Sequence, residues 1–182
     1  MVSNFDQNLD KNPSNFIPLS PITFLERAKD IYPDYEALVY KKRSYTWKQV
    51  YERSIKFASA LEKHGIKLGD TVSIMAANTP ELFEAHYSVP MTGAVLNAIN
   101  TRLDAKTVAY ILDHSEAKVL IVDRQLHTVI EKALSQTKTK PIIIDVQDDF
   151  VPQNIDWNRV LDIQRNENVS AYVEDLSTPD KW

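Results

Sequence analysis

The chain has 182 residues, of which 43% are hydrophobic and none is cysteine, and its 25 acidic and 21 basic residues give a formal net charge of −4. This length suits one domain with a substantial core, and the missing cysteines exclude a disulfide framework, cysteine-ligated zinc, iron–sulfur clusters and a cysteine nucleophile. No stretch reaches the roughly 18 apolar residues of a membrane span, and no basic stripe favours nucleic acid as a partner.

Residues 1–19 are rich in Asn, Asp, Ser and Pro and are predicted to form an extended arm. Only Phe5, Phe16 and Ile17 offer apolar side chains for packing. The arm has neither the apolar core of a secretory signal nor the Arg-rich composition of a transit peptide, so we expect a cytoplasmic location.

The next predicted elements are a short helix and a hairpin. Ser20-Pro21 opens the helix, and Tyr32-Pro33 ends it, because the residue before a proline disfavours helical geometry. Apolar residues at helical spacing are Ile22, Leu25, Ala28 and Ile31. Two β-prone runs follow, 37–40 and 44–45, and the charged residues Lys41, Lys42 and Arg43 between them indicate the turn of a small hairpin.

A longer helix is predicted to begin at Thr46. Gln49 lies three residues later, which is the spacing of a capping box, and Gly65 lies where a helix end requires left-handed backbone. The expected buried stripe of this helix consists of Val50, Phe57, Ala58 and Leu61.

From residue 71 onward, short apolar strands alternate with helices. The predicted strands are 71–75, 94–96, 119–122 and 142–144, and the predicted helices begin at Thr79, at Asp104 and near Leu126. The last two strands are continuous Val, Ile and Leu runs, as strands covered on both faces require. The pattern predicts an α/β fold, a partial doubly wound and mainly parallel sheet with flanking helices.

After Val146 the composition becomes rich in Asn and Asp. One short helical patch is predicted around Trp157, Val160, Leu161 and Ile163. The chain ends at Trp182, shortly after a Pro-containing loop, and we expect it to be leading into a further element there.

Ligands of open α/β sheets bind beyond the carboxyl ends of the strands, so the turns after the strands are the places to search. In the first turn, Thr79, Pro80 and Glu81 make a well-formed helix start. Its amides could hold an anion, but Glu81 would repel one, so capping is the preferred interpretation. Gly65, Gly69 and Gly93 match neither a dinucleotide fingerprint nor a phosphate loop.

Arg102 is the candidate binding residue of the second turn, residues 97–104. Its guanidinium suits phosphate or carboxylate. An ion pair with Asp104 or a nearby acid is nevertheless the preferred interpretation, because surface arginines commonly form such pairs.

Other chemistry-bearing residues indicate no site. The four histidines, at positions 64, 86, 114 and 127, lack a second ligand at metal spacing, and no serine has the glycines of a nucleophile elbow. Trp47, Tyr51 and Tyr87 suggest a stacking set, but core packing is the default at their spacing. No catalytic and no metal-binding residue is therefore assigned.

Taken together, several segments in register resemble the N-terminal part of the adenylate-forming acyl-CoA synthetases. They are Ala37–Tyr40, Ser44–Trp47, Gly65–Val72, Asn78–Glu81, Gly93–Asn97, Asn100–Asp104, Ile111–Ser115 and Lys118–Asp123. The chain is most similar to medium-chain, fatty or aromatic acyl-CoA ligases. The resemblance implies that residues 20–182 form the N-terminal portion of an AMP-dependent synthetase/ligase domain.

The resemblance further implies a two-step reaction, in which a carboxylic acid and MgATP give an acyl-adenylate and the thiol of coenzyme A then displaces AMP. The family's phosphate loop, magnesium-binding pair, ribose-binding Asp and catalytic Lys are not present in these residues, so we expect the chain to stop before the phosphate loop and to be inactive alone. ATP, magnesium and coenzyme A are the family's cofactors, and none is assigned to this chain by itself. In similar ligases an Arg matching Arg102 lies near the coenzyme A phosphates.

Two functional hypotheses follow from this resemblance. In the first, the chain is the N-terminal fragment of an acid–CoA ligase. In the second, it is a non-catalytic α/β binding or interaction module that pairs with a separately encoded C-terminal half. An unrelated flavodoxin-like regulatory domain is a third alternative, against which the register of the segments argues.

Overall fold

The computed structural model describes residues 16 and 20–146. The predictions for the arm, apart from Phe16, and for the helical patch near Trp157 lie outside these residues. The helices are α1 Pro21–Ile31, α2 Trp47–Lys63, α3 Pro80–Met91, α4 Ala105–His114, the 3₁₀ turn η1 Arg124–Leu126 and α5 His127–Leu134. The strands are β1 Glu36–Tyr40, β2 Arg43–Thr46, β3 Thr71–Met75, β4 Val95–Ala98, β5 Val119–Asp123 and β6 Ile142–Val146.

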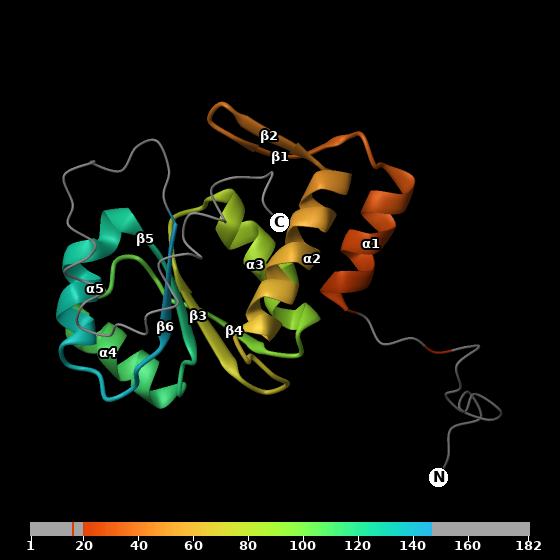
Figure 1. Cartoon of the computed structure of the whole chain (residues 1–182). Coiled ribbons are helices and arrows are strands. Elements are labelled where there is room, and N and C mark those ends of the chain that lie inside the picture. Colours follow the sequence, from red (N-terminus) through yellow and green to blue (C-terminus); the bar gives the residue numbers. More distant parts are fainter. Residues whose placement is uncertain (1–15, 17–19, 147–182) are drawn as a thin grey trace, which may run out of the picture.

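Four strands form one parallel sheet in the order β4-β3-β5-β6. Helices cover both faces: α2 and α3 lie on one side, and α4 and α5 lie on the other (Figure 1). The predicted α/β class and the doubly wound parallel sheet are therefore confirmed.

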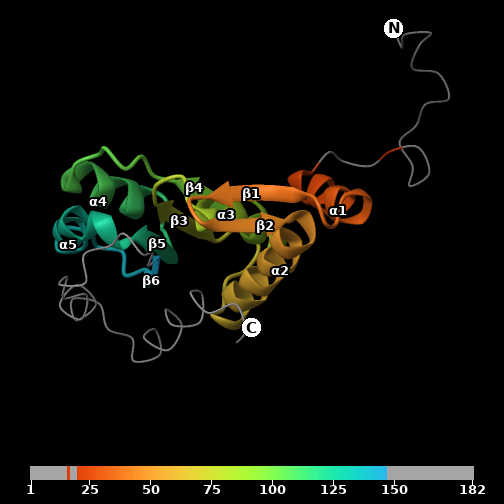
Figure 2. The ribbon, with the colours of Figure 1, turned by 90° about the horizontal axis from the view of Figure 1, so that it is seen from above.

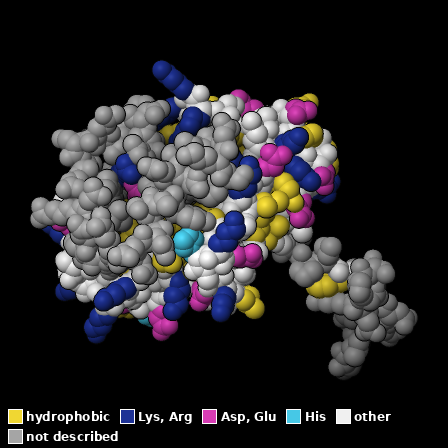
Figure 3. Space-filling view, viewed as in Figure 1, with side chains coloured by type: hydrophobic (Ala, Val, Ile, Leu, Met, Phe, Trp, Pro, Cys, Tyr) yellow, Lys and Arg dark blue, Asp and Glu magenta, His cyan; other side chains and the backbone are white. Residues whose placement is uncertain are grey.

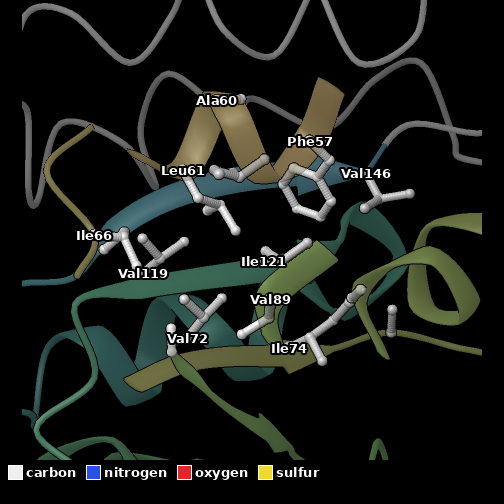
Figure 4. Close-up of a cluster of buried hydrophobic side chains, with 14 residues drawn as sticks. Phe57, Ala60, Leu61, Ile66, Val72, Ile74, Val89, Val119, Ile121 and Val146 are labelled. Carbon is white, nitrogen blue, oxygen red and sulfur yellow. The ribbon is translucent and has the colours of Figure 1, made fainter. Parts of the chain in front are cut away.

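Alternate residues of each strand serve two separate hydrophobic clusters. Val72, Ile74, Val119 and Ile121 face α2 and α3, where Phe57, Leu61 and Val89 complete the cluster shown in Figure 4. Met75, Leu120 and Val122 face the other way, toward α4 and α5. Every residue of β5 is buried, which confirms the two-sided cover that its continuous apolar sequence predicted.

The capping signals define where the helices begin. The Thr46 amide donates to Oε1 of Gln49 at 2.8 Å, and the Gln49 amide donates to Oγ1 of Thr46 at 3.3 Å, so the predicted capping box is confirmed. Gly65 has a φ of +83°, as predicted for the end of α2. The predicted buried stripe of α2 is also confirmed.

Some boundaries differ from the predicted ones. The strand predicted at 94–96 is Val95–Ala98, because its pairing with Thr71–Ile74 of β3 sets its ends. The last helix is preceded by the 3₁₀ turn η1, in which the Gln125 amide donates to Oδ1 of Asp123 at 2.9 Å.

The hairpin β1–β2 and α1 lie beside the sheet domain rather than in it. The hairpin is antiparallel, as predicted, and the Trp47 amide at the start of α2 donates to the Tyr35 carbonyl at 3.1 Å. Seen from above in Figure 2, the hairpin and α1 extend along the side of the sheet that carries α3. Within the described residues, no helix has the length and apolar character that crossing a membrane requires.

Candidate functional site

The carboxyl ends of β3 and β5 form the point where the winding of the sheet changes direction. These strands are neighbours in the sheet, but β3 leads into α3 on one face and β5 leads through η1 into α5 on the other face. Loops that diverge to opposite faces leave a crevice between them, and this crevice is where open α/β sheets bind ligands. The loops at this edge are therefore the candidate site.

The loop after β3 is held by the start of α3. Oγ1 of Thr79 accepts from the Leu82 amide at 3.4 Å, which confirms the predicted cap, while Ala77 and Asn78 are exposed. Glu81 lies 3.0 Å from Nη1 of Arg43 in the hairpin. The Glu81 carboxylate thus pairs with Arg43 of the hairpin and occupies the first turn of α3.

A second Arg–Glu pair lies one helical turn further along α3. Arg53 of α2 binds Glu84 through two nitrogens, Nε at 2.5 Å and Nη2 at 3.0 Å. The Glu84 side chain is 5% exposed, and burial raises the pKa of its carboxyl while the Arg53 guanidinium opposes that rise. The guanidinium of Arg53 also lies 4.8 Å from the centroid of the Tyr45 ring in β2. These contacts fix the hairpin and α2 to the first half of α3.

The loop after β5 carries a third ion pair. Nε of Arg124 donates to Oδ2 of Asp145 in β6, and Oδ1 of Asp145 is buried without a hydrogen-bond partner in the described part of the chain. Burial raises the pKa of Asp145, and Arg124 opposes the rise. The pair ties η1 to the neighbouring strand at the carboxyl edge.

Arg102 follows β4 at this same edge. Its side chain is exposed and makes no ion pair with any acid among the described residues. The carboxylate of Asp104 instead caps α4, accepting from the amides of Lys106 and Thr107 at 3.0 and 3.1 Å. The hydroxyl and amide of Thr107 lower the pKa of Asp104. The preferred interpretation of Arg102, an ion pair with Asp104 or a nearby acid, is therefore wrong for the described residues, and the guanidinium faces solvent.

The remaining candidate residues are dispersed. No ring contact joins Trp47, Tyr51 and Tyr87: Nζ of Lys29 lies 4.6 Å from the centroid of Tyr51, and Tyr87 packs edge-to-face on Phe83. The histidines lie at separate helix positions, with His86 bonded to the Leu82 carbonyl and His114 stacked on Tyr110. In residues 16 and 20–146 no three potential metal ligands come together.

A shallow hollow lies between α1 and α3, away from the candidate site. Ser20, Pro21, Phe24 and Tyr87 line it. Phe24 is 60% exposed there, and hydrophobic side chains also gather over α1 and α2 in Figure 3.

Sequence reasoning missed the partners in all three Arg–acid pairs. Two features of the sequence indicate acidic side chains that require a partner. Glu81 and Glu84 are three residues apart on one face of α3, and Asp145 interrupts a continuous apolar strand. Neither signal identifies the arginines, because Arg43 and Arg53 come from elements more than 30 residues earlier in the chain, at sequence separations of 38 and 31.

Comparison with protein families gives one consistent result. Residues 25–178 match the model of the AMP-binding enzyme family. Acetate–CoA ligase CCL3 of Humulus lupulus is 46% identical over 134 residues, which are 74% of this chain and 24% of that enzyme. Acetate/butyrate–CoA ligase AAE7 of Arabidopsis thaliana is 38% identical over 95% of this chain and 31% of that enzyme. The chain thus spans between about a fifth and a third of the length of the curated relatives it matches.

Solved structures agree with this result. The anthranilate CoA ligase AuaEII, in complex with anthranoyl-AMP, has a TM-score of 0.68 at 25% identity over 71% of this chain and 26% of that one. A benzoate CoA ligase from Burkholderia xenovorans has a TM-score of 0.64 at 26% identity, over 69% of this chain and 25% of that one. The described α/β unit thus corresponds to one part of larger enzymes.

Proposed function

Because the chain belongs to the AMP-binding enzyme family, we propose that it forms the N-terminal part of an ATP-dependent ligase that joins a carboxylic acid to coenzyme A. The proposed reaction begins with attack of the carboxylate on the α-phosphate of ATP, which gives an acyl-adenylate and pyrophosphate. The coenzyme A thiol then attacks the acyl carbon and releases AMP. Positioning and electrostatic stabilisation are the main means by which proteins assist such phosphoryl chemistry.

The observation that carries this proposal is the family match over residues 25–178. The names of the relatives support the type of reaction, since they are CoA ligases for acetate, butyrate, benzoate and cinnamate. These acids range from short aliphatic to aromatic, so the proposed substrate is a fatty or aromatic carboxylic acid. A cytoplasmic location stays a prediction, because several relatives carry the word peroxisomal in their names.

In this proposal the described residues supply the scaffold and none of the groups that act on the reacting atoms. The three Arg–acid pairs and the helix caps fix the loops at the carboxyl edge. The phosphate loop, the magnesium-binding residues and the catalytic lysine would come from residues that follow this sequence or from a separately encoded C-terminal half. We therefore expect the chain alone to form no adenylate.

ATP–pyrophosphate exchange with acetate, butyrate, benzoate and cinnamate tests this proposal. The 182-residue chain should show no acid-dependent exchange, and the chain extended through the coding sequence after Trp182, or mixed with a separate C-terminal half, should show it. Exchange by the chain alone would disprove the dependence on further residues. Absence of exchange and of acyl-CoA formation in every combination would count against the ligase proposal itself.

We further propose that Arg102 contacts a phosphate of coenzyme A. Its exposed guanidinium lacks an ion-pair partner in the described part of the chain and lies in the loop after β4, at the edge where ligands of such sheets bind. A charge-assisted hydrogen bond of this kind contributes about 1.5–3 kcal/mol, which corresponds to roughly a tenfold or greater change in binding.

Arg102→Gln in the active ligase should raise the KM for coenzyme A about tenfold and leave ATP–pyrophosphate exchange unchanged, since exchange does not require coenzyme A. Arg27→Gln is the matched control, because Arg27 is an exposed arginine on α1. An unchanged KM for coenzyme A in Arg102→Gln would show that this residue does not contact the cosubstrate.

A further inference from the structure

The hairpin β1–β2 reaches over the carboxyl edge of the sheet. Arg43, the first residue of β2, lies 3.0 Å from Glu81 in the first turn of α3, and α3 begins shortly after the end of β3. Figures 1 and 2, which show the molecule from two directions, agree that the hairpin crosses above α3 toward β3. Its turn therefore stands beside the loops that form the candidate site.

The turn of this hairpin is basic. Lys41, Lys42 and Arg43 follow one another, and residues 37–46 contain no acid. Lys41 and Lys42 are exposed, and Lys and Arg side chains project from the top of the molecule in Figure 3, where the hairpin lies. Nζ of Lys41 and the guanidinium carbon of Arg43 lie 4.9 and 5.2 Å from the centroid of the Tyr40 ring. The turn thus places a concentrated positive charge at the carboxyl edge.

Ion pairs and a ring contact join the hairpin to α2 and α3. Arg43 pairs with Glu81, and Arg53, which packs on Tyr45 of the same hairpin, binds Glu84 through two nitrogens. Nη2 of Arg43 remains without an acceptor in the described residues, so the Arg43–Glu81 pair uses one of the two terminal nitrogens. A binding element that is already held in place loses little conformational freedom on binding.

From this arrangement we propose that the β1–β2 turn binds a phosphate group of a cosubstrate through Lys41 and Lys42, with Arg43 as a positioning residue. The inference rests on the proposed function, in which ATP and coenzyme A both bring phosphates to the carboxyl edge. Lysine suits this role because its ammonium group acts as a point charge toward phosphate oxygens. Arg43 acts indirectly, by holding the turn to α3 through Glu81.

The double variant Lys41→Gln/Lys42→Gln tests the proposal in the active ligase. The KM for MgATP is measured by pyrophosphate exchange without coenzyme A, and the KM for coenzyme A is measured in the complete reaction. We expect one of these values to rise about fivefold to tenfold with kcat unchanged, since a unit charge pair at contact distance in water corresponds to roughly a fivefold change. The KM that rises identifies the cosubstrate, ATP or coenzyme A, whose phosphate the turn binds. Lys118→Gln/Lys140→Gln, which removes two exposed lysines at the opposite edge of the sheet, is the matched control.

Equilibrium titration of the same proteins with MgATP and with coenzyme A gives a second readout that does not depend on turnover. Weaker binding of one ligand to the double variant, at an unchanged melting temperature, would support the inference. Unchanged binding and KM values, or a loss that appears only together with lower stability, would overturn it. If the lysine variants show no effect but the wild-type active ligase turns over acids normally, only the inference about the turn is wrong and the proposed ligase function stands. If the wild-type extended protein neither turns over acids nor binds MgATP or coenzyme A, both proposals are wrong.

Arg43→Ala separates positioning from direct contact. It should raise the same KM as the lysine variant, and Arg43→Lys, which keeps the charge available to Glu81, should restore most of the loss. Equal defects in both Arg43 variants would contradict a role for the Glu81 pair in holding the turn.

Discussion

Asp113, in the last turn of α4, holds a loop that lies more than 20 residues later in the chain. Its Oδ1 accepts hydrogen bonds from the Lys138 and Thr139 amides and the Thr139 hydroxyl, each at 2.9 Å, and from the Thr137 hydroxyl. These donors, the Thr137 hydroxyl first among them, lower the pKa of Asp113 to about 2. The carboxylate thereby fixes the path of the chain from α5 into β6.

This lowered pKa predicts an acid-dependent loss of stability. The folded-state pKa of Asp113, about 2, lies below the ordinary value of 3.8. The ionised carboxylate therefore contributes its full share to the free energy of unfolding above pH 4, and this contribution is lost as the pH falls toward 2. Asp113→Asn should reduce the free energy of unfolding at pH 7 by roughly 1 kcal/mol, allowing for solvent screening, and should flatten its pH dependence between these limits. Urea denaturation at several pH values measures both effects.

Asp34→Asn is the control for this experiment, since Asp34 is exposed in the loop after α1. It should leave stability and its pH dependence unchanged. An Asp113→Asn protein with the wild-type acid profile would show that the loop contacts of Asp113 do not depend on its charge.

At the scale of elements, the packing of α2 on α3 includes an ion pair where an apolar contact would be expected. The Arg53 and Glu84 side chains are 16% and 5% exposed, and Ser54 and Ser88 on the same helices are fully buried. Burying two charges costs much of the energy that their attraction returns, so such a pair contributes more to the alignment of the helices than to net stability.

Removing one partner of this pair should be far more harmful than removing both. Glu84→Gln should lower the free energy of unfolding by about 3 kcal/mol, because the Arg53 charge stays buried without its counterion. The double variant Arg53→Met/Glu84→Leu should recover most of that loss, and chemical denaturation of the three proteins measures the difference.

Glu62→Gln, an exposed site near the end of α2, serves as the control for charge removal on a helix surface. A double variant as unstable as Glu84→Gln would indicate that the pair stabilises the packing of α2 on α3 directly.

At the scale of the whole molecule, the outer side of β4 has no neighbouring strand in the described part of the sheet. Val95 is 55% exposed on this strand, and Leu68 beside Gly93 is 86% exposed. An unpaired strand edge next to apolar side chains favours association between chains.

We therefore expect the 182-residue chain to self-associate in a concentration-dependent way. Val95→Lys/Leu68→Lys should shift sedimentation velocity profiles toward the monomer, because charged side chains on an edge strand oppose edge-to-edge pairing. Ile55→Lys, on the exposed side of α2 and 43% exposed in the wild type, should leave the profile unchanged. A monomeric wild-type chain at high concentration would contradict the prediction.

Most helices and strands of the fold could be predicted from residues close together in the sequence. Thr46 and Gln49 marked the start of α2, Thr79 and Asp104 marked the starts of α3 and α4, and the apolar runs marked β3, β5 and β6. Each of these signals acts between residues close in the chain, so sequence spacing alone expresses it. The alternation of strands and helices then left a doubly wound parallel sheet as the natural architecture.

The candidate site was only partly predictable. The sequence placed Arg102 and Glu81 in the turns after the strands, and the structure added that Asp104 caps α4 rather than pairing with Arg102 and that Glu81 binds Arg43. The position of the basic turn at residues 41–43 over the carboxyl edge also emerged only from the folded chain (Figure 2).

By itself, the sequence determined the class of fold, the order of its elements, the helix caps and the resemblance to adenylate-forming ligases, because periodicity, capping and motif spacing are properties of neighbouring residues. The tertiary structure alone decided which charges meet: Arg43 with Glu81, Arg53 with Glu84, and Arg124 with Asp145. Such partners are chosen by how helices and strands pack, since a charge removed from water requires a counterion at whatever point the fold brings one within reach.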